Sequence, residues 1–442
     1  MTLHRTATNQ SSRSRRSCGE TLSQAASKVK SNQETYASPS DPLVGHLGHL
    51  TREQAEALDT FKTQCREKQL YTPAEGDKAA SHDDATLLRF LRARRFDVKG
   101  ALDQFEATEN WRKENQIKDL YENFDLDSYE ESRRVYPQWT GRRDRRGIPV
   151  YVFVIKDLNS KNMAAYSSST MSKATSSTHS SSKVPPRLLR LFALYENMIR
   201  FVLPLCSSLP RPNPETQIVS TTNIVDISGV GLKQFWNLKG HMQDASVLAT
   251  AHYPETLDRI FIIGAPSFFP TVWGWIKRWF DPVTTSKIFI LPASEVKSTL
   301  SSFIDPANFP KRYGGELDWE WGDMPNLDEP ARALIGPLER IGEFGDKEDS
   351  GKDDQGAPKS FVKGPVVWNN NQIEIYGSVN GKQRNRVLAP DTDPKTVLKP
   401  AISSTPNGAL TDKPNSEAKK VVVDAQGTQI NGTVQEPAHI SL

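Results

Sequence analysis

The sequence predicts an α/β protein in which a small helical bundle precedes a largely parallel sheet covered by helices. Two observations lead to this prediction. Between residues 148 and 304, apolar runs typical of strands alternate with helical patterns. Before residue 118, three helical segments with apolar stripes follow one another without a strand between them. Both ends of the 442-residue chain are long and polar, which is typical of disorder.

Three helix starts define the predicted N-terminal bundle. Thr51 can cap a helix over 52–70, and Gln54 occupies the reciprocal position of a capping box. Asp83 can cap a second, leucine-rich helix, and Asp97 can cap a third that includes Trp111. Because each helix has one apolar stripe, we expect the three to pack on one another.

Apolar runs further along the chain predict the strands of the sheet. We expect strands over 148–155, 218–227, 260–263 and 288–291. We expect helices over 186–206, 232–252 and 294–304, with an aromatic helix between the last two strands. The Ser/Thr-rich segment 159–182 has little to bury and is predicted to be a surface insertion.

These patterns divide the chain into four parts. We predict a disordered basic arm over 1–48, an N-terminal helical domain over 49–118, an α/β domain over 119–317 and a mostly disordered tail over 318–442. Within that tail, segment 365–377 has strand character, which suits either an edge strand or a linear motif.

Composition and charge exclude several classes of protein. The net charge of +3 is too small to indicate nucleic-acid binding. The three cysteines are scattered without metal or redox spacing, which favours a reducing compartment. No apolar run is long enough to span a membrane, and the N-terminus lacks the apolar core of a secretory signal. Its Arg- and Ser-rich composition is shared with transit peptides, but a flexible basic arm is the preferred interpretation.

The stretch from His252 to Leu291 carries the strongest functional signal. A strand-like run leads into a segment rich in Phe and Trp, and a second apolar strand follows. Two ionisable residues, Glu255 and Lys287, lie at the edges of this apolar unit. The combination is typical of a site that holds an apolar ligand behind an aromatic lid and binds its polar head with a few charges.

Signatures of catalysis are missing from the sequence. There is no G-x-x-x-x-G-K-[ST], no G-x-S-x-G and no complete G-x-G-x-x-G. A lone HxxH at His46 and His49 lies in a stretch predicted to be flexible, which argues against a metal site there. We therefore expect no enzymatic activity, no metal and no cofactor.

A series of ordered motifs resembles one family. The motifs are LLRFLRARRFDV (87–98), WRKE (111–114), YPQ (136–138), PVY (149–151), LPLCS (203–207), YPE (253–255), the IIGAP turn, DPVTTSKIFIL (281–291) and FPKRYGG (309–315). Together they look like the CRAL-TRIO lipid-binding family, closest to the fungal phosphatidylinositol/phosphatidylcholine transfer proteins. The resemblance covers about residues 50–317 and implies a helical domain followed by an α/β lipid pocket.

The resemblance also implies two sets of headgroup residues. For phosphatidylinositol they are Arg94, Arg95, Glu255 and Lys287, whose cations suit a phosphodiester and whose carboxylate suits a polyol. For phosphatidylcholine they are Thr140, Tyr151, Tyr195, Thr221 and Asn223. Thr140 stands where the family has tyrosine and Asn223 where it has threonine, which weakens the choline prediction. The alternative for each charged residue alone is a solvated side chain.

The aromatic segment corresponds to the mobile gate helix of that family. The residues predicted for the gate and its membrane contact are Phe268, Phe269, Trp273, Trp275, Lys277, Arg278, Trp279 and Phe280. Tryptophan beside basic residues suits a membrane interface. The alternative is an ordinary core helix.

The resemblance implies a carrier that extracts phosphatidylinositol and exchanges it between membranes or presents it to lipid kinases. The expected partners are a phospholipid ligand, a transiently bound membrane surface and a protein held by the C-terminal tail, with no nucleic acid. The expected location is the cytoplasm, with visits to Golgi, endosomal or other membranes. The alternatives are a lipid-gated interaction protein and a carrier of another hydrophobic ligand such as a sterol.

Overall fold

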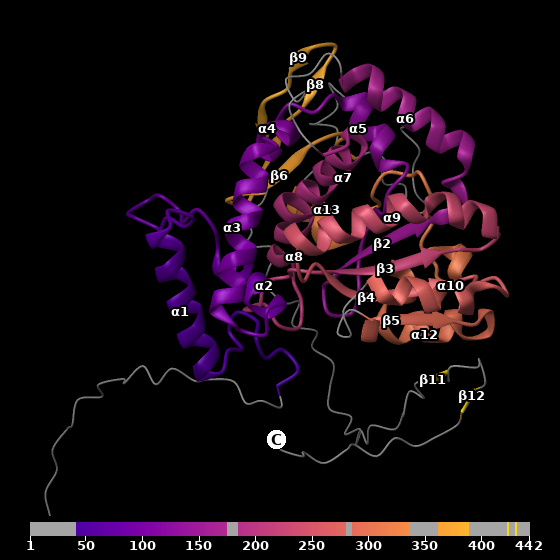
Figure 1. Ribbon diagram of the computed structural model, residues 1–442, viewed down its shortest axis with the longest axis horizontal. Helices are drawn as coiled ribbons and strands as arrows, with labels where there is room; N and C mark the ends of the chain where they lie inside the picture. Colours follow the sequence, from indigo (N-terminus) through magenta and orange to yellow (C-terminus); the bar gives the residue numbers. More distant parts are fainter. Residues whose placement is uncertain are drawn as a thin grey trace, which may run out of the picture. The chain divides into compact units, whose positions relative to one another are not determined.

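The computed structural model describes residues 41–174, 184–279, 285–335 and 361–388, and a short antiparallel pair of strands, β11 (Val422–Val423) and β12 (Gln429–Ile430). In these residues an N-terminal helical bundle is followed by an α/β unit, as the sequence predicted (Figure 1). No helix among the described residues combines the length and the apolar character needed to cross a bilayer.

The bundle is built from α1 (Arg52–Glu67), α2 (Asp84–Ala93) and α3 (Val98–Glu114), each with the N-cap that was predicted. Thr51 and Gln54 form the complete capping box, and Asp83 and Asp97 accept hydrogen bonds from backbone N–H groups of the first turns. Helix α1 ends before residue 70 because Gln69 adopts a left-handed conformation (φ +59°). The core of the bundle contains Phe61, Phe90 and Phe105, whose rings meet edge to face.

The N-terminal boundary predicted at residue 48 is too late. Residues 41–50 form hydrogen-bonded turns, including a β-bridge between His46 and His49. Leu47 and Leu50 pack against the core of the bundle. Two short helices that the sequence did not predict, α4 (Ile117–Glu122) and α5 (Leu126–Arg133), follow the bundle.

The sheet has five strands in the order β1-β2-β3-β4-β5. Their bounds are β1 (Gln138–Arg143), β2 (Pro149–Val154), β3 (Thr221–Asp226), β4 (Leu257–Ile263) and β5 (Ile288–Leu291). Strands β2 to β5 are parallel and correspond to the four predicted strands. Strand β1 is an unpredicted antiparallel edge, and its polar sequence QWTGRR explains why apolar patterning missed it.

The two faces of the sheet follow from alternation along the strands. On one face Val152, Ile224 and Phe261 pack with α12 (Val296–Phe303) and with the segment around Trp319. On the other face Ile262 packs beneath two helices, α9 (Leu232–His252) and α10 (Phe269–Ile276). Short 3-10 turns connect these elements: η1 (Ile155–Asp157), η3 (Lys277–Trp279), η4 (Ala293–Glu295), η5 (Pro306–Asn308) and η6 (Lys311–Tyr313).

Part of the segment predicted as a surface insertion is a helix. Residues Ser160–Ala174 form α6, and its Tyr166 is buried and packs edge to face on Tyr136. Tyr166, the partly buried Met163 and a hydrogen bond from Ser169 to Glu131 attach this otherwise polar helix, and its Ser- and Thr-rich composition did not indicate these contacts. Residues 175–183 lie outside the described part. The predicted helix over 186–206 is three consecutive pieces, α7 (Pro186–Asn197), a π-helical turn η2 (Met198–Val202) and α8 (Leu203–Ser208).

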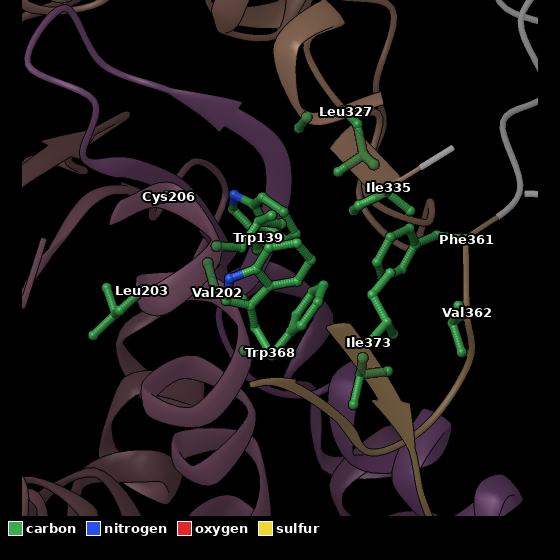
Figure 2. Close-up of a cluster of buried hydrophobic side chains, with 14 of the residues drawn as sticks. Trp139, Val202, Leu203, Cys206, Leu327, Ile335, Phe361, Val362, Trp368 and Ile373 are labelled. Atoms are coloured by element: carbon green, nitrogen blue, oxygen red, sulfur yellow. The ribbon is translucent and has the colours of Figure 1, made fainter. Parts of the chain in front are cut away.

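The chain beyond residue 317 contributes to the core, so the boundary predicted there is too early. Helix α13 (Glu329–Ile335) and strands β6 (Val366–Asn369), β7 (Gln372–Ile375) and β10 (Arg386–Leu388) are described there, with a small hairpin of β8 (Ser378–Val379) and β9 (Lys382–Gln383). Figure 2 shows Phe361 and Trp368 packed with Trp139 in one apolar cluster. The hydroxyl of Tyr121 in α4 donates to the Val366 carbonyl at 2.7 Å and accepts from the Val366 N–H at 2.9 Å.

Candidate functional site

Three side chains from distant parts of the chain meet at the edge of the sheet, and we name them the edge cluster. Arg92 lies in the last turn of α2, Glu255 in the turn between α9 and β4, and Lys287 immediately before β5. The Arg92 Nη2 lies 2.9 Å and the Lys287 Nζ 3.4 Å from the same oxygen, Oε2 of Glu255. The three side chains are between 17% and 23% exposed, so solvent screens them only partly.

Local backbone geometry positions this carboxylate. Glu255 has a left-handed conformation (φ +58°), which is uncommon for a residue with a side chain and is held here by the surrounding structure. Lys287 is held by two backbone contacts, since its Nζ donates to the carbonyl of Leu257 at 3.1 Å and its own carbonyl accepts from Ile260 at 3.0 Å. The cluster therefore combines strand pairing with one strained turn.

Burial and charge also act on the groups beside the cluster. Burial lowers the pKa of Arg92, while the charge of Glu255 opposes this change. Burial and the nearby Arg92 guanidinium lower the pKa of His46 to about 4, which keeps that ring neutral near pH 7. The HxxH motif suggested only a metal ligand at His46, whereas in the structure His46 is a neutral neighbour of the edge cluster.

The predicted inositol-lipid residues are only partly brought together. Glu255 and Lys287 meet, but Arg94 and Arg95 lie exposed just past the end of α2. Helix α2 ends at Ala93, and the left-handed conformation of Arg95 (φ +52°) turns the chain there. Arg92 was not among the predicted site residues. Arg92 lies about one helical turn after Arg89 and therefore on the same face of α2, which is buried at Arg89. This spacing is the signal that could have identified it.

The predicted choline-lipid residues are mostly engaged with the protein itself. Thr140 is fully buried and donates to the Val150 carbonyl at 3.0 Å. Thr221 donates to the Thr256 carbonyl at 3.1 Å, and Asn223 donates to the Thr221 hydroxyl at 2.8 Å. These contacts leave few free donors at the three positions.

The two predicted choline-lipid tyrosines lie in different surroundings. Tyr151 is adjacent to Asn223 in the pairing of β2 with β3 and lines a cavity of about 60 Å³ with Trp139 and Phe361. Tyr195 stacks on Tyr253 with ring centroids 4.7 Å apart, and burial raises its pKa to about 12. The cavity beside Tyr151 is well below the roughly 300–1,000 Å³ of typical small-ligand sites.

The aromatic helix α10 has a buried face and an exposed face. Phe269 and Val272 are buried against the sheet, and the partly buried Trp273 stacks on Phe269 at 6.3 Å. Trp275 is 39% exposed, and Lys277 and Arg278 follow it in exposed positions. Phe268 is partly buried, whereas Phe280 and the side chain of Trp279 lie outside the described part.

A neighbouring helix extends this exposed aromatic surface. Trp236 of α9 is 56% exposed and meets Trp275 edge to face at 5.8 Å. The ammonium of Lys239 lies 4.9 Å from the centre of the Trp236 ring, within cation–π range. Trp236 was not among the predicted membrane-contact residues, because a lone tryptophan on an amphipathic helix is ordinarily a core residue.

The fold and the edge cluster together define a class of protein. It has an N-terminal helical bundle attached to a five-stranded α/β sheet, and charged groups lie at the rim of an apolar sheet face that an aromatic helix covers. Family models match both parts, "CRAL/TRIO, N-terminal domain" over residues 57–107 and "CRAL/TRIO domain" over residues 133–315. The chain belongs to the CRAL/TRIO family, which confirms the family predicted from the motifs.

Similar proteins are known from fungi and plants. The chain is 35% identical to a SEC14 cytosolic factor of Yarrowia lipolytica, over 66% of this chain and 54% of that protein. It is 32% identical to the SEC14 cytosolic factor of Kluyveromyces lactis, over 73% of this chain and 94% of that protein. It is 31% identical to the phosphatidylinositol/phosphatidylcholine transfer protein SFH9 of Arabidopsis thaliana, over 60% of this chain and 41% of that protein.

Proposed function

We propose that this protein binds phosphatidylinositol and transfers it between membranes. The observation that carries the proposal is the edge cluster, which puts two cations and one carboxylate at the rim of an apolar sheet face. The similarity to a plant phosphatidylinositol/phosphatidylcholine transfer protein and to fungal SEC14 cytosolic factors supports it. The proposed place of action is the cytosol, with transient contact at Golgi, endosomal or other membranes.

The edge cluster has the chemistry that an inositol phosphate headgroup requires. Lys287 and Arg92 can each give up their contact with Glu255 to bind a phosphodiester, and the released carboxylate can accept from inositol hydroxyl groups. We keep Arg94, Arg95, Glu255 and Lys287 as the proposed headgroup residues and add Arg92. The exposed Arg94 and Arg95 would then be the first cations that an arriving headgroup meets.

The acyl chains need space that α10 occupies in this structure. Phe269 and Val272 hold the helix on the sheet, so binding requires α10 to move outward. Burying a methylene group is worth about 0.8 kcal/mol relative to water, but a bilayer offers the chains an equally apolar environment. Exchange at a membrane is therefore nearly balanced, and contact of Trp275, Lys277 and Arg278 with the interface would favour the open state.

We propose phosphatidylcholine as a second and weaker ligand. The hydroxyl groups of Thr140 and Thr221 already donate to backbone carbonyls, which leaves Tyr151 and Tyr195 as the aromatic contributions to a choline site. A tyrosine at position 140, as in the family, has no room here, because Thr140 is fully buried. The substitution Thr140→Tyr is therefore expected to destabilise the fold and not to improve choline-lipid binding.

The test of the proposal is a transfer assay with Lys287→Ala and two lipids. Loss of the cation leaves the bound phosphate partly unpaired, at a cost of about 1.5–3 kcal/mol, or roughly 10- to 100-fold in affinity. Phosphatidylinositol transfer between vesicles should fall strongly, and phosphatidylcholine transfer should change little. Lys99→Ala, which removes an exposed lysine of the bundle, is the matched control. An equal loss for both lipids, or no loss, contradicts the assignment.

A second candidate function is a lipid-gated interaction protein, which one observation favours. Phe361 and Val362, from the C-terminal part, line the small cavity beside Tyr151, so a lipid that displaces Tyr151 would also displace the C-terminal part. Removing everything after residue 317 cannot separate the two functions, because that cut removes part of the core. Truncation after Leu388 is the suitable test: full transfer activity supports the carrier, and a loss supports the interaction protein.

A carrier of another hydrophobe, such as a sterol, makes a different prediction about the bound molecule. Mass spectrometry of lipid that copurifies with the full chain distinguishes these ligands directly. Phosphatidylinositol as the main species supports the proposal, and a sterol without phospholipid contradicts it.

A further inference from the structure

A cleft lies between the helical bundle and the α/β unit, and we name it the interdomain cleft. Its volume is about 910 Å³. One wall is formed by α2 and α3, and the other by α8, by residues 217–219 and by residues 368–371, at the end of β6 and in the turn before β7. The segment 368–371, which is the end of β6 and the turn after it, lies outside the region matched by the family models, whereas α8 and residues 217–219 lie inside it.

Arg89 is the unusual residue of this cleft. It is 5% exposed, and its Nη1 is buried without a hydrogen-bond partner. Within the described residues no carboxylate lies at ion-pair distance from Arg89. Burial lowers the pKa of Arg89 to about 10, and the charge of Asp83 opposes this change. A guanidinium carries five N–H donors, and its burial without an anion is costly.

The other three arginines of the cleft each have hydrogen-bond or ion-pair partners. Arg112 makes a two-point contact with Glu196, at 2.7 and 2.9 Å. Arg200 pairs with Glu122 at 2.6 Å, and Arg211 donates to several backbone carbonyls, including those of Leu209 and Thr216. His252 is kept neutral, because burial lowers the pKa of its ring to about 4. Among the four arginines that line the cleft, Arg89 is therefore the one for which the described residues provide neither a carboxylate nor a carbonyl partner.

We propose that the interdomain cleft binds a phosphate group, with Arg89 as its principal cation. Thr86, Gln217 and Asn371 also line the cleft and offer neutral donors of the kind that phosphate oxygens accept. The volume is in the range of sites for small organic ligands, which suits a phosphate ester better than a bare ion. The phosphate can belong to a soluble compound or to a lipid headgroup. This inference does not depend on the edge cluster.

The experiment measures thermal unfolding of the full chain with inorganic phosphate or glycerol 1-phosphate, which lack the inositol ring that the edge cluster would bind, against chloride at equal ionic strength. Binding to the folded state raises Tm, and at 100 times Kd the unfolding constant falls about 100-fold. Arg89→Met should abolish the shift while leaving the ligand-free Tm unchanged or higher, because it removes a buried unpaired charge. Arg66→Met, at an exposed position on α1, should keep the shift.

Two further arms complete the test. Arg89→Lys keeps the charge but loses the two-point geometry, so Kd by titration calorimetry should rise about tenfold. Vesicles with and without phosphatidic acid test the lipid source: Arg89-dependent binding to the anionic vesicles alone assigns the site to a headgroup, and binding of the soluble probes assigns it to a free compound. No response of the natural chain to any probe, or the same response in Arg89→Met or Arg89→Lys, overturns the proposal.

Discussion

His252 shows how packing sets the charge of a single residue. Its ring is stacked on Trp111 with centroids 4.2 Å apart, and its Nδ1 lies 3.3 Å from the Thr108 hydroxyl. Burial, and then the charge of Arg112, lower the pKa of this histidine to about 4. An unperturbed histidine has a pKa near 6.5, so the folded state resists protonation that the unfolded chain accepts.

This difference predicts a loss of stability in mild acid. Because the folded pKa is below the unfolded one, the contribution of His252 is fully present above about pH 6.5 and is lost as pH falls towards 4. His252→Phe keeps an aromatic ring without the titration, so its free energy of unfolding should fall less steeply in this window. Urea unfolding at several pH values measures the slope. Identical slopes for the two proteins would show that His252 is not the titrating group.

At the scale of one element, α10 has the composition of a lid. Its first turn contains Pro270, which suits a helix start, and its two faces differ in burial. Phe269 holds it on the sheet, while Trp275 reaches Trp236 on the surface. A short helix held by a few apolar contacts can move without unfolding the sheet beneath it.

Locking α10 to α9 should therefore stop lipid exchange. We would replace Trp236 and Trp275 by cysteines and join them with a short, cleavable thiol cross-linker, since their rings meet at 5.8 Å. Cys65 and Cys206 are buried, and Cys18 would be changed to serine. Transfer should stop after cross-linking and return after cleavage, while Tm does not fall. The control is the double-cysteine variant that has not been treated with the cross-linker. Unimpaired exchange in the cross-linked form would mean that lipid enters elsewhere.

At the scale of the whole molecule, the C-terminal part completes the core of the α/β unit. Trp368 packs in the apolar cluster of Figure 2 and donates to the Ser208 hydroxyl at 3.0 Å. Tyr121 connects α4 to strand β6 through Val366, 245 positions later in the chain. Such distant contacts make the domain depend on residues beyond the family match.

Tyr121→Phe tests this dependence with a change of one atom. The Tyr121 hydroxyl is buried, so its removal leaves the N–H and C=O groups of Val366 without that partner, at a cost of about 1–3 kcal/mol. Urea unfolding should show a lower midpoint and an unchanged m value. Tyr376→Phe, which removes a part-buried contact with Glu374, should cost less. An equal or smaller cost for Tyr121→Phe would contradict this account.

Local sequence patterns were enough to predict the starts of the three bundle helices and the four parallel strands. The capping box at Thr51 and the apolar runs of β2 to β5 are local patterns, and local hydrogen bonding and side-chain alternation act over a few residues. Ordered motifs likewise identified the family, because they preserve the identity and order of the residues.

The pairing of the charged groups and the end of the domain depend on contacts between distant parts of the chain. Arg92 reaches Glu255 across 163 positions because α2 ends at Ala93, a geometry that directs Arg94 and Arg95 elsewhere. The strands beyond residue 365 are stable because their apolar side chains are buried against helices far upstream. Burial and pairing depend on the whole fold, and neither is encoded in the spacing of neighbouring residues.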